Sequence, residues 1–519
     1  MTSPFGKPSD VQVRSTLSTV VAQPAGAQRG TTPLNQPIGS ALSGENYIVR
    51  DGALELRPAL STITGVAGET SAWDSRGPVG GGFELQNVLG KRYAMSFHSD
   101  QYIYYDETNA DWVQGSIGTG GGAGKMRGNQ QTRWDLAQIY LDTVDDNVVV
   151  AVSDAQQSLF YARPIPQEFG TLTNLIGAKR VATFDNYVLA ANIFESASTL
   201  TFPQRVQWSD RGSASSWTGG LSGFEDLLAA RGEIQRIIAL ENRVIVFFDD
   251  ETWQGLPSDY PFTFRFSPID QGIGCPYPWT ATVTPQGVVF MARDFQVYLL
   301  PKAGGQPTPI GSAIQRKIRS DITWPDRAFS VYDPNMQQYE MFYCASTDSY
   351  PRNAAFMDIN SGAWSFQSFP VYLTAGFAAH ERPDRSNAVI PMLASSQGTM
   401  YYLNSSYTRD AVSGTTPAIS AYWEFMPFGG DGPAAQKSIM EVRVDYDAPS
   451  ASSLTVRTSP SNGDSFSAGV GLSLRTTSVV SQDIAYVQEA SRYPVVRLEQ
   501  ESQRQRIHRA FVTARIGGR

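Results

Sequence analysis

Short apolar runs, paired across polar turns, recur along most of this chain and constrain its fold more than any other feature. In the first pair, residues 93–97 are followed by a turn at 98–100 and then by residues 102–105. Short runs rich in Val, Ile, Tyr and Phe are typical of β-hairpins. The turns recur every ~45 to 55 residues, close to the length of one propeller blade. The further pairs are 148–152 with 159–161, 187–192 with 205–208, 244–248 with 252–253, 288–292 with 296–300, 340–343 with 355–358, and 389–393 with 400–403.

A four-stranded sheet with two apolar faces is not stable alone in water, whereas packing such sheets around an axis covers both faces. The repeat therefore predicts a mainly β protein whose body is a β-propeller of about six to eight blades. The 46 glycines and 31 prolines are enough for the many tight turns that this fold needs. Two or three unrelated β-sandwiches are the alternative, because sandwiches also give frequent turn signals. The long spacing between similar hairpins favours the propeller, because a sandwich does not require it.

The two ends of the chain differ from the repeat. Residues 1–45 are poor in charge and rich in Ser, Thr, Pro and Gly, which predicts an extended N-terminal arm or a disordered tail. We favour an arm that docks on a neighbouring subunit through its apolar residues. The propeller-like body is assigned to residues 46–425, before a glycine- and proline-rich break. Residues 426–519 alternate like strands and predict a small antiparallel β-sandwich, and strands from residues 46–70 are candidates to complete it. The docking residues of the arm would be Val11, Val13, Leu17, Val20 and Val21.

Charge and cysteine content argue against several classes of protein. The net charge is −8 and the isoelectric point is near 5.1, which does not suit a protein whose main task is to grip phosphates. Cys275 and Cys344 are the only cysteines, too few for a disulfide framework, and are predicted to be reduced core residues. No apolar run approaches the ~20 residues of a membrane span, and the start lacks the apolar stretch of a signal peptide. We therefore expect a protein that is made in a cytoplasm and stays soluble.

No catalytic, cofactor-binding or metal-binding motif stands out. Residues 115–125 are rich in glycine but lack the first glycine and the hydroxyl residue of a phosphate-binding loop, so a surface loop is expected. Residues 459–466 resemble the Asp-box turn of sialidase-like propellers, which shapes a hairpin and carries no chemistry. His98, His380 and His508 are far apart and lack the spacing of a zinc site. We therefore expect a non-enzymatic protein without a cofactor.

The C-terminal segment has the most unusual charge pattern. Residues 492–519 hold seven arginines against two glutamates, a local charge of +5, so the remainder carries −13 of the total of −8. Arginine binds carboxylates through a planar fork of donors, which suits a seam between subunits. A solvated strand face and contact with DNA are the alternatives. The candidate inter-subunit residues are Arg497, Arg504, Arg506, Arg509 and Arg515.

A succession of segments resembles the packaged-DNA stabilisation proteins, which are the tail nozzle or hub subunits of short-tailed bacteriophages. The resemblance is moderate over about residues 40–330, is weaker towards the C-terminus, and rests on the order of the segments. Residues 43–58 are similar to the opening strand of many phage head–tail and tail proteins. The segments that follow in order are 206–212, 216–217, 234–246, 248–253, 260–262, 271–276 and 287–290.

The resemblance implies a structural subunit of the virion tail, assembled in the bacterial host cytoplasm. Such a subunit forms a ring, expected to be a homo-hexamer, below the portal and adaptor, and its channel conducts the genomic DNA without binding it specifically. The ring retains packaged DNA until ejection, and its neighbours are the adaptor, a tail needle or plug, and a tailspike or fibre. The alternatives are a carbohydrate-binding or carbohydrate-cleaving propeller, such as a tailspike, and another head–tail completion protein.

Overall fold

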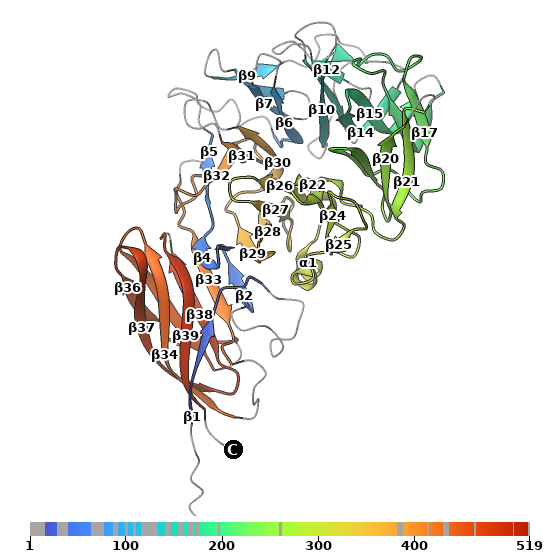
Figure 1. The fold of residues 1–519 in the computed structure, drawn as a ribbon. Coiled ribbons are helices and arrows are strands. Elements are labelled where there is room, and N and C mark those ends of the chain that lie inside the picture. The colour runs from blue at the N-terminus through green and yellow to red at the C-terminus, as the bar shows by residue number, and fades with distance from the viewer. Residues whose placement is uncertain are drawn as a thin grey trace, which may run out of the picture. The chain divides into compact units, whose positions relative to one another are not determined.

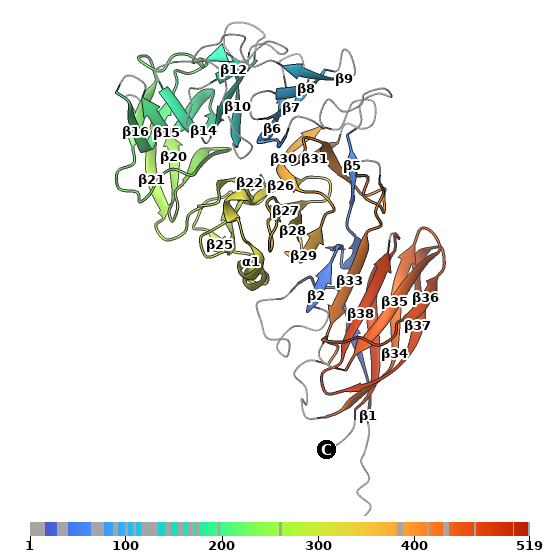
Figure 2. The same cartoon turned by 180° about the vertical axis from the view of Figure 1, so that it is seen from behind.

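The computed structural model describes most of the chain and divides it into two compact units. The first unit comprises residues 1–57, 363–367 and 418–519, and the second comprises 58–362 and 368–417. Figures 1 and 2 show the strands of both units from opposite sides. The residues described are 16–27, 40–63, 77–86, 92–98, 102–106, 111–115, 133–140, 147–153, 160–162, 170–171, 176–195, 198–258, 262–380, 388–412, 415–428, 435–460, 463–501 and 503–516.

The second unit is a β-propeller of seven four-stranded sheets, counted over the described residues, except that residues 364–367 in the last strand of the sixth sheet group with the first unit. Neighbouring sheets share hydrophobic cores. Tyr187 of the third sheet packs with Phe264 of the fourth, and Phe247 of the fourth packs with Phe290 of the fifth. The first strands β6, β10 and β14 contact one another in order, and β30 of the last sheet contacts β6 of the first, which closes the ring.

The strands of the seven sheets, in sheet order, are β6 (Gly81–Gln86), β7 (Arg92–Phe97), β8 (Tyr102–Asp106) and β9 (Asp111–Gly115); β10 (Trp134–Tyr140), β11 (Asn147–Ser153), β12 (Phe160–Ala162) and β13 (Gly170–Thr171); β14 (Ile176–Phe184), β15 (Tyr187–Glu195), β16 (Leu200–Trp208) and β17 (Gly223–Asp226); β18 (Arg236–Leu240), β19 (Arg243–Phe247), β20 (Thr252–Pro257) and β21 (Phe264–Asp270); β22 (Thr282–Thr284), β23 (Gly287–Met291), β24 (Val297–Pro301) and β25 (Thr308–Pro309); β26 (Phe329–Asp333), β27 (Gln338–Tyr343), β28 (Asn353–Asp358) and β29 (Trp364–Ser368); and β30 (Leu373–His380), β31 (Val389–Ser395), β32 (Met400–Asn404) and β5 (Ala59–Thr62).

All seven expected hairpins are present in the structure. Each of the seven corresponds to the pairing of the second strand with the third strand in one sheet, from β7 with β8 to β31 with β32. These two strands lie in the middle of a blade, are adjacent in the chain and are joined by a local turn. In several blades, such as those of β15 and β27, a middle strand is also buried along most of its length.

The last blade is closed by a strand from the beginning of the chain. Strand β5 pairs antiparallel with β32, so that Leu60 lies opposite Leu403. The backbone N–H of Leu60 also donates a 2.8 Å hydrogen bond to Oδ1 of the buried Asp410. Because β5 and β32 are separated by more than 300 residues, this pairing joins the two ends of the ring.

The first unit is a β-sandwich. One sheet has the order β3-β4-β39-β34-β37 with β1 also paired to β39, and the other has the order β2-β33-β38-β35-β36. Val444 of the first sheet and Val456 of the second belong to one buried core, so the two sheets pack face to face. The strands are β1 (Thr16–Ala22), β2 (Ser43–Glu45), β3 (Tyr47–Arg50), β4 (Ala53–Leu56), β33 (Ser420–Phe425), β34 (Lys437–Ala448), β35 (Ser452–Ser459), β36 (Val470–Leu474), β37 (Thr477–Ser491), β38 (Val495–Glu501) and β39 (Arg506–Ile516).

The expected N-terminal arm contains a strand that docks on its own chain. Strand β1 pairs with β39 from Thr16 opposite Ile516 to Ala22 opposite Ala510, rather than with a neighbouring subunit. This pairing is possible because β39 has an edge that β34 does not cover. Val11 and Val13 lie outside the described residues. Strands β2, β3 and β4 join the sandwich, so the units divide after residues 57 and 417 rather than at the expected 45 and 425.

Helical structure is limited, among the described residues, to one α-helix and short 3₁₀ turns. The α-helix is α1 (Gln315–Asp321), and the 3₁₀ turns include η2 (Pro278–Thr280) and η3 (Pro325–Arg327). Ile314 and Ile318, one turn apart, are both fully buried and fix α1 to the propeller. The glycine-rich loop at 118–124 lies outside the described residues.

Candidate functional sites

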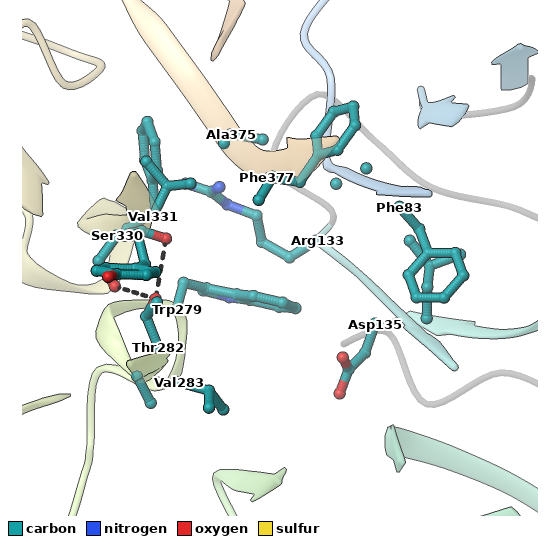
Figure 3. A pocket seen from close by; sticks show the side chains of 18 of the residues that line it. Phe83, Arg133, Asp135, Trp279, Thr282, Val283, Ser330, Val331, Ala375 and Phe377 are labelled. Carbon is teal, nitrogen blue, oxygen red and sulfur yellow. Dashed lines mark hydrogen bonds between the residues drawn. The ribbon is translucent and has the colours of Figure 1, made fainter. Parts of the chain in front are cut away.

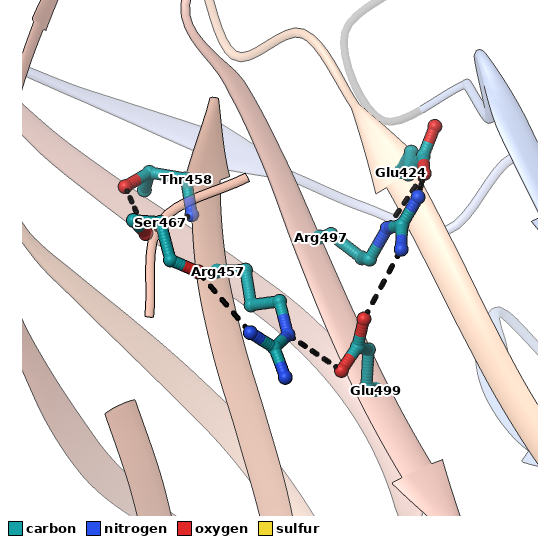
Figure 4. A network of polar contacts seen from close by, with 6 residues as sticks. All are labelled: Glu424, Arg457, Thr458, Ser467, Arg497 and Glu499. Carbon is teal, nitrogen blue, oxygen red and sulfur yellow. Dashed lines mark hydrogen bonds and ion pairs between the residues drawn. The ribbon is translucent and has the colours of Figure 1, made fainter. Parts of the chain in front are cut away.

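Arg497 lies within an ion-pair network of its own chain (Figure 4). Its Nε atom donates to Oε1 of Glu424 at 2.6 Å, and its Nη1 atom donates to Oε1 of Glu499 at 3.2 Å. Nε of Arg457 donates to the other oxygen of Glu499 at 2.8 Å. The register of β33, β38 and β35 places Glu424, Arg497 and Arg457 side by side across the sheet. Four charged groups therefore stabilise the second sheet of the sandwich.

Electrostatics keeps the Arg497 guanidinium charged. Burial alone would lower the pKa of Arg497, but hydrogen bonds and charge interactions with Glu424 and Glu499 outweigh burial and raise it. The rings of Tyr422 and Phe466 also lie within 4.7 and 4.0 Å of the guanidinium carbon.

The other four candidate arginines fall into two groups. Nε of Arg506 contacts Oε1 of Glu55 at 2.7 Å, which ties β39 to β4, and burial lowers the pKa of the nearby Arg504. Arg509 and Arg515 are exposed on β39 and form no ion pair with a described residue. Of the five arginines, these two are the ones left available to a partner.

Arg509 and Arg515 belong to the outer face of the six-stranded sheet. Strand register aligns residues across this face: Ile484 lies opposite Arg443, which lies opposite Phe511, which in turn lies opposite Val21. Side chains in direct register point to the same side of a sheet. We call this surface the outer sandwich face. The exposed apolar members that the register places on it are Leu17, Val21, Ile484 and Tyr486, while the exposed Met440, Val479 and Val480 lie at irregularities of β34 and β37.

Strand β37 forms the edge of this face. It has 15 residues and pairs only with β34 among the described strands. Tyr486 and Val479 on β37 are 72% and 69% exposed. A long edge strand with exposed apolar side chains is a surface on which another chain can pair or pack.

A cavity of about 520 Å³ lies on the axis of the propeller (Figure 3). Its walls come from the first strands of six blades and the segments beside them, including β6, β10, β18, β26 and β30. Aromatic side chains make up much of the wall, namely Phe83, Trp279, Phe329 and Phe377. Sequence reasoning missed this site, because its residues are scattered and share no motif.

Three arginines surround Trp279 in and beside this cavity. The guanidinium carbons of Arg236, Arg180 and Arg133 lie 4.9, 5.1 and 6.0 Å from the centre of the indole ring. Figure 3 shows Arg133 beside Trp279, and it shows Asp135 among the other lining side chains. Nη1 of Arg236 lies 2.7 Å from Oδ1 of Asp135. Asp135 is the one carboxylate that lines the cavity among the described residues.

Metal-ligating side chains are not clustered in the described part of the chain. No group of three or more His, Cys, Asp or Glu is placed there to hold a metal ion. His98 is buried in the first blade, His380 pairs with Glu84 at 2.6 Å, and His508 pairs with Asp447 at 2.7 Å. His380 and His508 are thus each partly buried against a carboxylate.

Both cysteines are buried free thiols, as expected. Burial raises the pKa of Cys275 to about 12 and that of Cys344 to about 12. A thiol with such a pKa forms almost no thiolate at neutral pH. Among the described helices, none is long and apolar enough to cross a membrane.

Comparison with known proteins identifies similar folds only. No protein-family model matches the chain, and no curated protein matches it. One similar solved structure is PorZ, a surface component of the type-IX secretion system of Porphyromonas gingivalis, with 10% identity and a TM-score of 0.36. That match covers 74% of this chain and 45% of PorZ, so the chain spans less than half of PorZ. Another is YCF48 from Cyanidioschyzon merolae, with 7% identity and a TM-score of 0.39. That match covers 67% of this chain and 99% of the YCF48 chain.

Proposed function

We propose that this protein is a structural subunit of the tail nozzle ring of a short-tailed bacteriophage. Copies of the chain, six in the ring, form a conduit for genomic DNA below the portal and adaptor. The ring retains the packaged DNA until ejection, and it contacts a tail needle or plug and a tailspike or fibre. The order of segments described above, from residues 43–58 to residues 287–290, supports this family.

The outer sandwich face carries the argument for assembly. Its apolar side chains lie beside two exposed arginines, Arg509 and Arg515, and along the edge strand β37. Interface cores are enriched in aromatic residues, Met and Arg and are depleted of Lys and Glu. Burial of exposed side chains such as Tyr486 would also remove a free strand edge from water. Glu441 and Asp445 also lie on this face, opposite Thr513 and Arg509, so the apolar part contributed by β1 and β37 is the part that resembles a surface covered in an assembly.

The charge distribution is compatible with a DNA conduit. The chain carries −8 in total, which disfavours tight, non-specific binding of the phosphate backbone. A channel that must release DNA quickly benefits from a surface that does not hold it.

Cleavage of a carbohydrate is less well supported by the axial cavity. Glycosidases generally need two carboxyl groups placed on either side of the scissile bond. Among the described lining residues the cavity offers only Asp135, whose carboxylate is paired with Arg236.

Mass photometry of the purified full-length chain tests the proposal. We expect discrete multimers of the 56.7 kDa chain that grow with concentration or on addition of the adaptor from the same particle. The double variant Ile484→Ser with Tyr486→Ser should remain monomeric while it keeps the circular dichroism spectrum of the parent. Leu228→Ser is the control, because the exposure of Leu228, 78%, is close to the 72% of Tyr486, but Leu228 lies in the propeller unit.

Two results would count against the proposal. One is a strict monomer at every concentration, with no adaptor binding. The other is an unchanged assembly of the double variant at moderate salt. Immunogold labelling of virions would then separate a nozzle subunit from a head–tail completion protein at another position.

A further inference from the structure

We propose that the axial cavity of the propeller binds a small organic anion that carries a carboxylate or a phosphate group. The proposal concerns the second unit alone and does not depend on the role of the chain in a ring. It rests on the charge of the cavity, on the way its arginines are held, and on the size and apolarity of its walls.

The cavity has an excess of positive charge. Arg133 and Arg236 line it, Arg180 lies beside the same tryptophan, and Asp135 is the single lining carboxylate among the described residues. Like charges that share a partly buried site repel each other, because the low effective dielectric screens them poorly. A bound anion would relieve this repulsion and add charge-assisted hydrogen bonds.

Backbone carbonyl groups hold two of these arginines in place. Arg133 donates to the carbonyl oxygens of Thr374 and, at 2.9 Å, of Arg327. Arg180 donates to the carbonyl oxygens of Gln235 and, at 3.0 Å, of Lys179. Carbonyl acceptors orient a guanidinium without cancelling its charge. The cationic wall is therefore positioned before any ligand arrives, which lowers the entropic cost of binding.

Arg236 has an unused donor. Its Nη1 atom faces Asp135, whereas its Nε atom is buried and donates to no acceptor among the described residues. A buried polar group without a partner costs free energy, and an oxyanion in the cavity would supply the missing acceptor. This observation points to a ligand and not merely to a structural ion pair.

The size and walls of the cavity specify an organic molecule rather than a bare inorganic ion. Its volume of about 520 Å³ lies within the ~300–1,000 Å³ range of small-molecule sites. Phe83, Phe329 and Phe377 provide apolar surface for a carbon skeleton, while the arginines lie near Trp279. A ligand with one apolar side and one anionic group matches both features.

Isothermal titration calorimetry with three sugars tests the proposal on the full-length chain. Glucuronate carries a carboxylate, glucose 6-phosphate carries a phosphate, and glucose is the neutral counterpart of both. We expect one or both anions to bind with a Kd of about 1 mM or tighter, and glucose to bind at least about tenfold more weakly. The stronger of the two anions identifies the preferred group.

Three variants locate the binding. Arg236→Gln should weaken binding of the anion about tenfold or more, because one charge-assisted contact is lost. Ala378→Trp keeps every arginine but fills the cavity from an exposed position of its wall, and should abolish binding. Arg316→Gln removes an equal charge from an exposed position of α1 and should change nothing.

Other outcomes would overturn the assignment. If neither anion binds the parent protein better than glucose does, the cavity is not an anion site. Equal weakening by Arg316→Gln would show that the anion responds to any arginine of the protein and not to this cavity. Unchanged binding by a folded Ala378→Trp variant would place the anion elsewhere. Because ring assembly is measured separately, failure here leaves the proposed function untouched.

Discussion

Arg236 of the fourth blade and Asp135 of the second blade form an ion pair beside the axial cavity, with 2.7 Å between Nη1 and Oδ1. The other oxygen of Asp135 accepts a 3.2 Å hydrogen bond from the backbone N–H of Val181 in the third blade. One carboxylate therefore connects the first strands of three successive blades. Its side chain is 6% exposed, so the interactions are made in a medium of low dielectric.

Asp135→Asn should consequently destabilise the protein by about 2–4 kcal/mol, because the change leaves the Arg236 guanidinium without its buried counter-ion. The free energy of unfolding is measured by urea titration with tryptophan fluorescence. Asp185→Asn is the control, because Asp185 lies 2.7 Å from Arg211 in a pair that is about half exposed. Exposed pairs contribute less than about 1 kcal/mol, so equal shifts for both variants would contradict the role assigned to Asp135.

The arginines of the C-terminal segment should separate into folding and assembly residues. Arg497→Gln leaves Glu424, whose side chain is 8% exposed, without its cation, and should lower the free energy of unfolding by about 2–3 kcal/mol. Arg515→Gln removes an exposed charge and should change that free energy by less than about 0.5 kcal/mol. Thermal unfolding monitored by circular dichroism compares the two variants.

For assembly, we expect Arg515→Gln to have a clear effect although it leaves folding stability nearly unchanged. In mass photometry, Arg515→Gln should reduce multimer formation at low salt, and added salt should weaken the effect because it screens exposed charges. If Arg515→Gln lowered the melting temperature as much as Arg497→Gln does, the division of the segment into two groups would be wrong.

These contrasts show what the sequence could and could not predict. The middle hairpin of every blade was predictable, because its apolar runs are adjacent in the chain and its turn is local. The cluster of C-terminal arginines was visible as a run of charge. The division of these arginines into buried and exposed groups was not predictable, because Arg497 contacts Glu424 only through the register of β38 with β33.

The axial cavity lay beyond sequence reasoning for a related reason. Arg133, Arg236 and Trp279 come from three blades, and each stands near the start of its blade with no shared spacing. Only closure of the ring brings them together. The pairing of β5 with β32 was equally hidden, because partners separated by more than 300 residues leave no local pattern.

Glu340 should make stability depend on pH. It is fully buried on β27, and neither carboxylate oxygen accepts a hydrogen bond from a described residue. Burial, with a smaller contribution from the charge of Asp333, raises the pKa of Glu340 well above its ordinary value of 4.5. The folded protein thus retains a proton that the unfolded chain releases above about pH 4.5. Stability from this group is therefore complete below that pH and falls as the pH rises towards the folded-state pKa.

Glu340→Gln removes this dependence, because the amide is neutral at every pH. Relative to the parent, the variant should be more stable at pH 7 and should lose that advantage at pH 4. Urea unfolding at the two pH values provides the measurement. The variant Glu241→Gln, at an exposed turn, serves as the control and should show no such difference. A Glu340→Gln advantage that persists unchanged at pH 4 would exclude the raised pKa as its cause.

Closure of the propeller should depend on a single strand from the start of the chain. Leu60 of β5 is fully buried, so Leu60→Ala should cost about 2–5 kcal/mol of unfolding free energy through lost burial and the cavity left behind. Leu228→Ala, at an exposed position in the third blade's final loop, should cost less than about 0.5 kcal/mol.

Hydrogen exchange tests whether β5 closes the ring. Because β5 joins the two ends of the ring, amides of β32 and β6 should exchange faster in Leu60→Ala, while those of β19 and β20, on blade four, stay protected. Uniformly faster exchange in all seven blades would mean that Leu60 contributes general stability and that closure is held elsewhere.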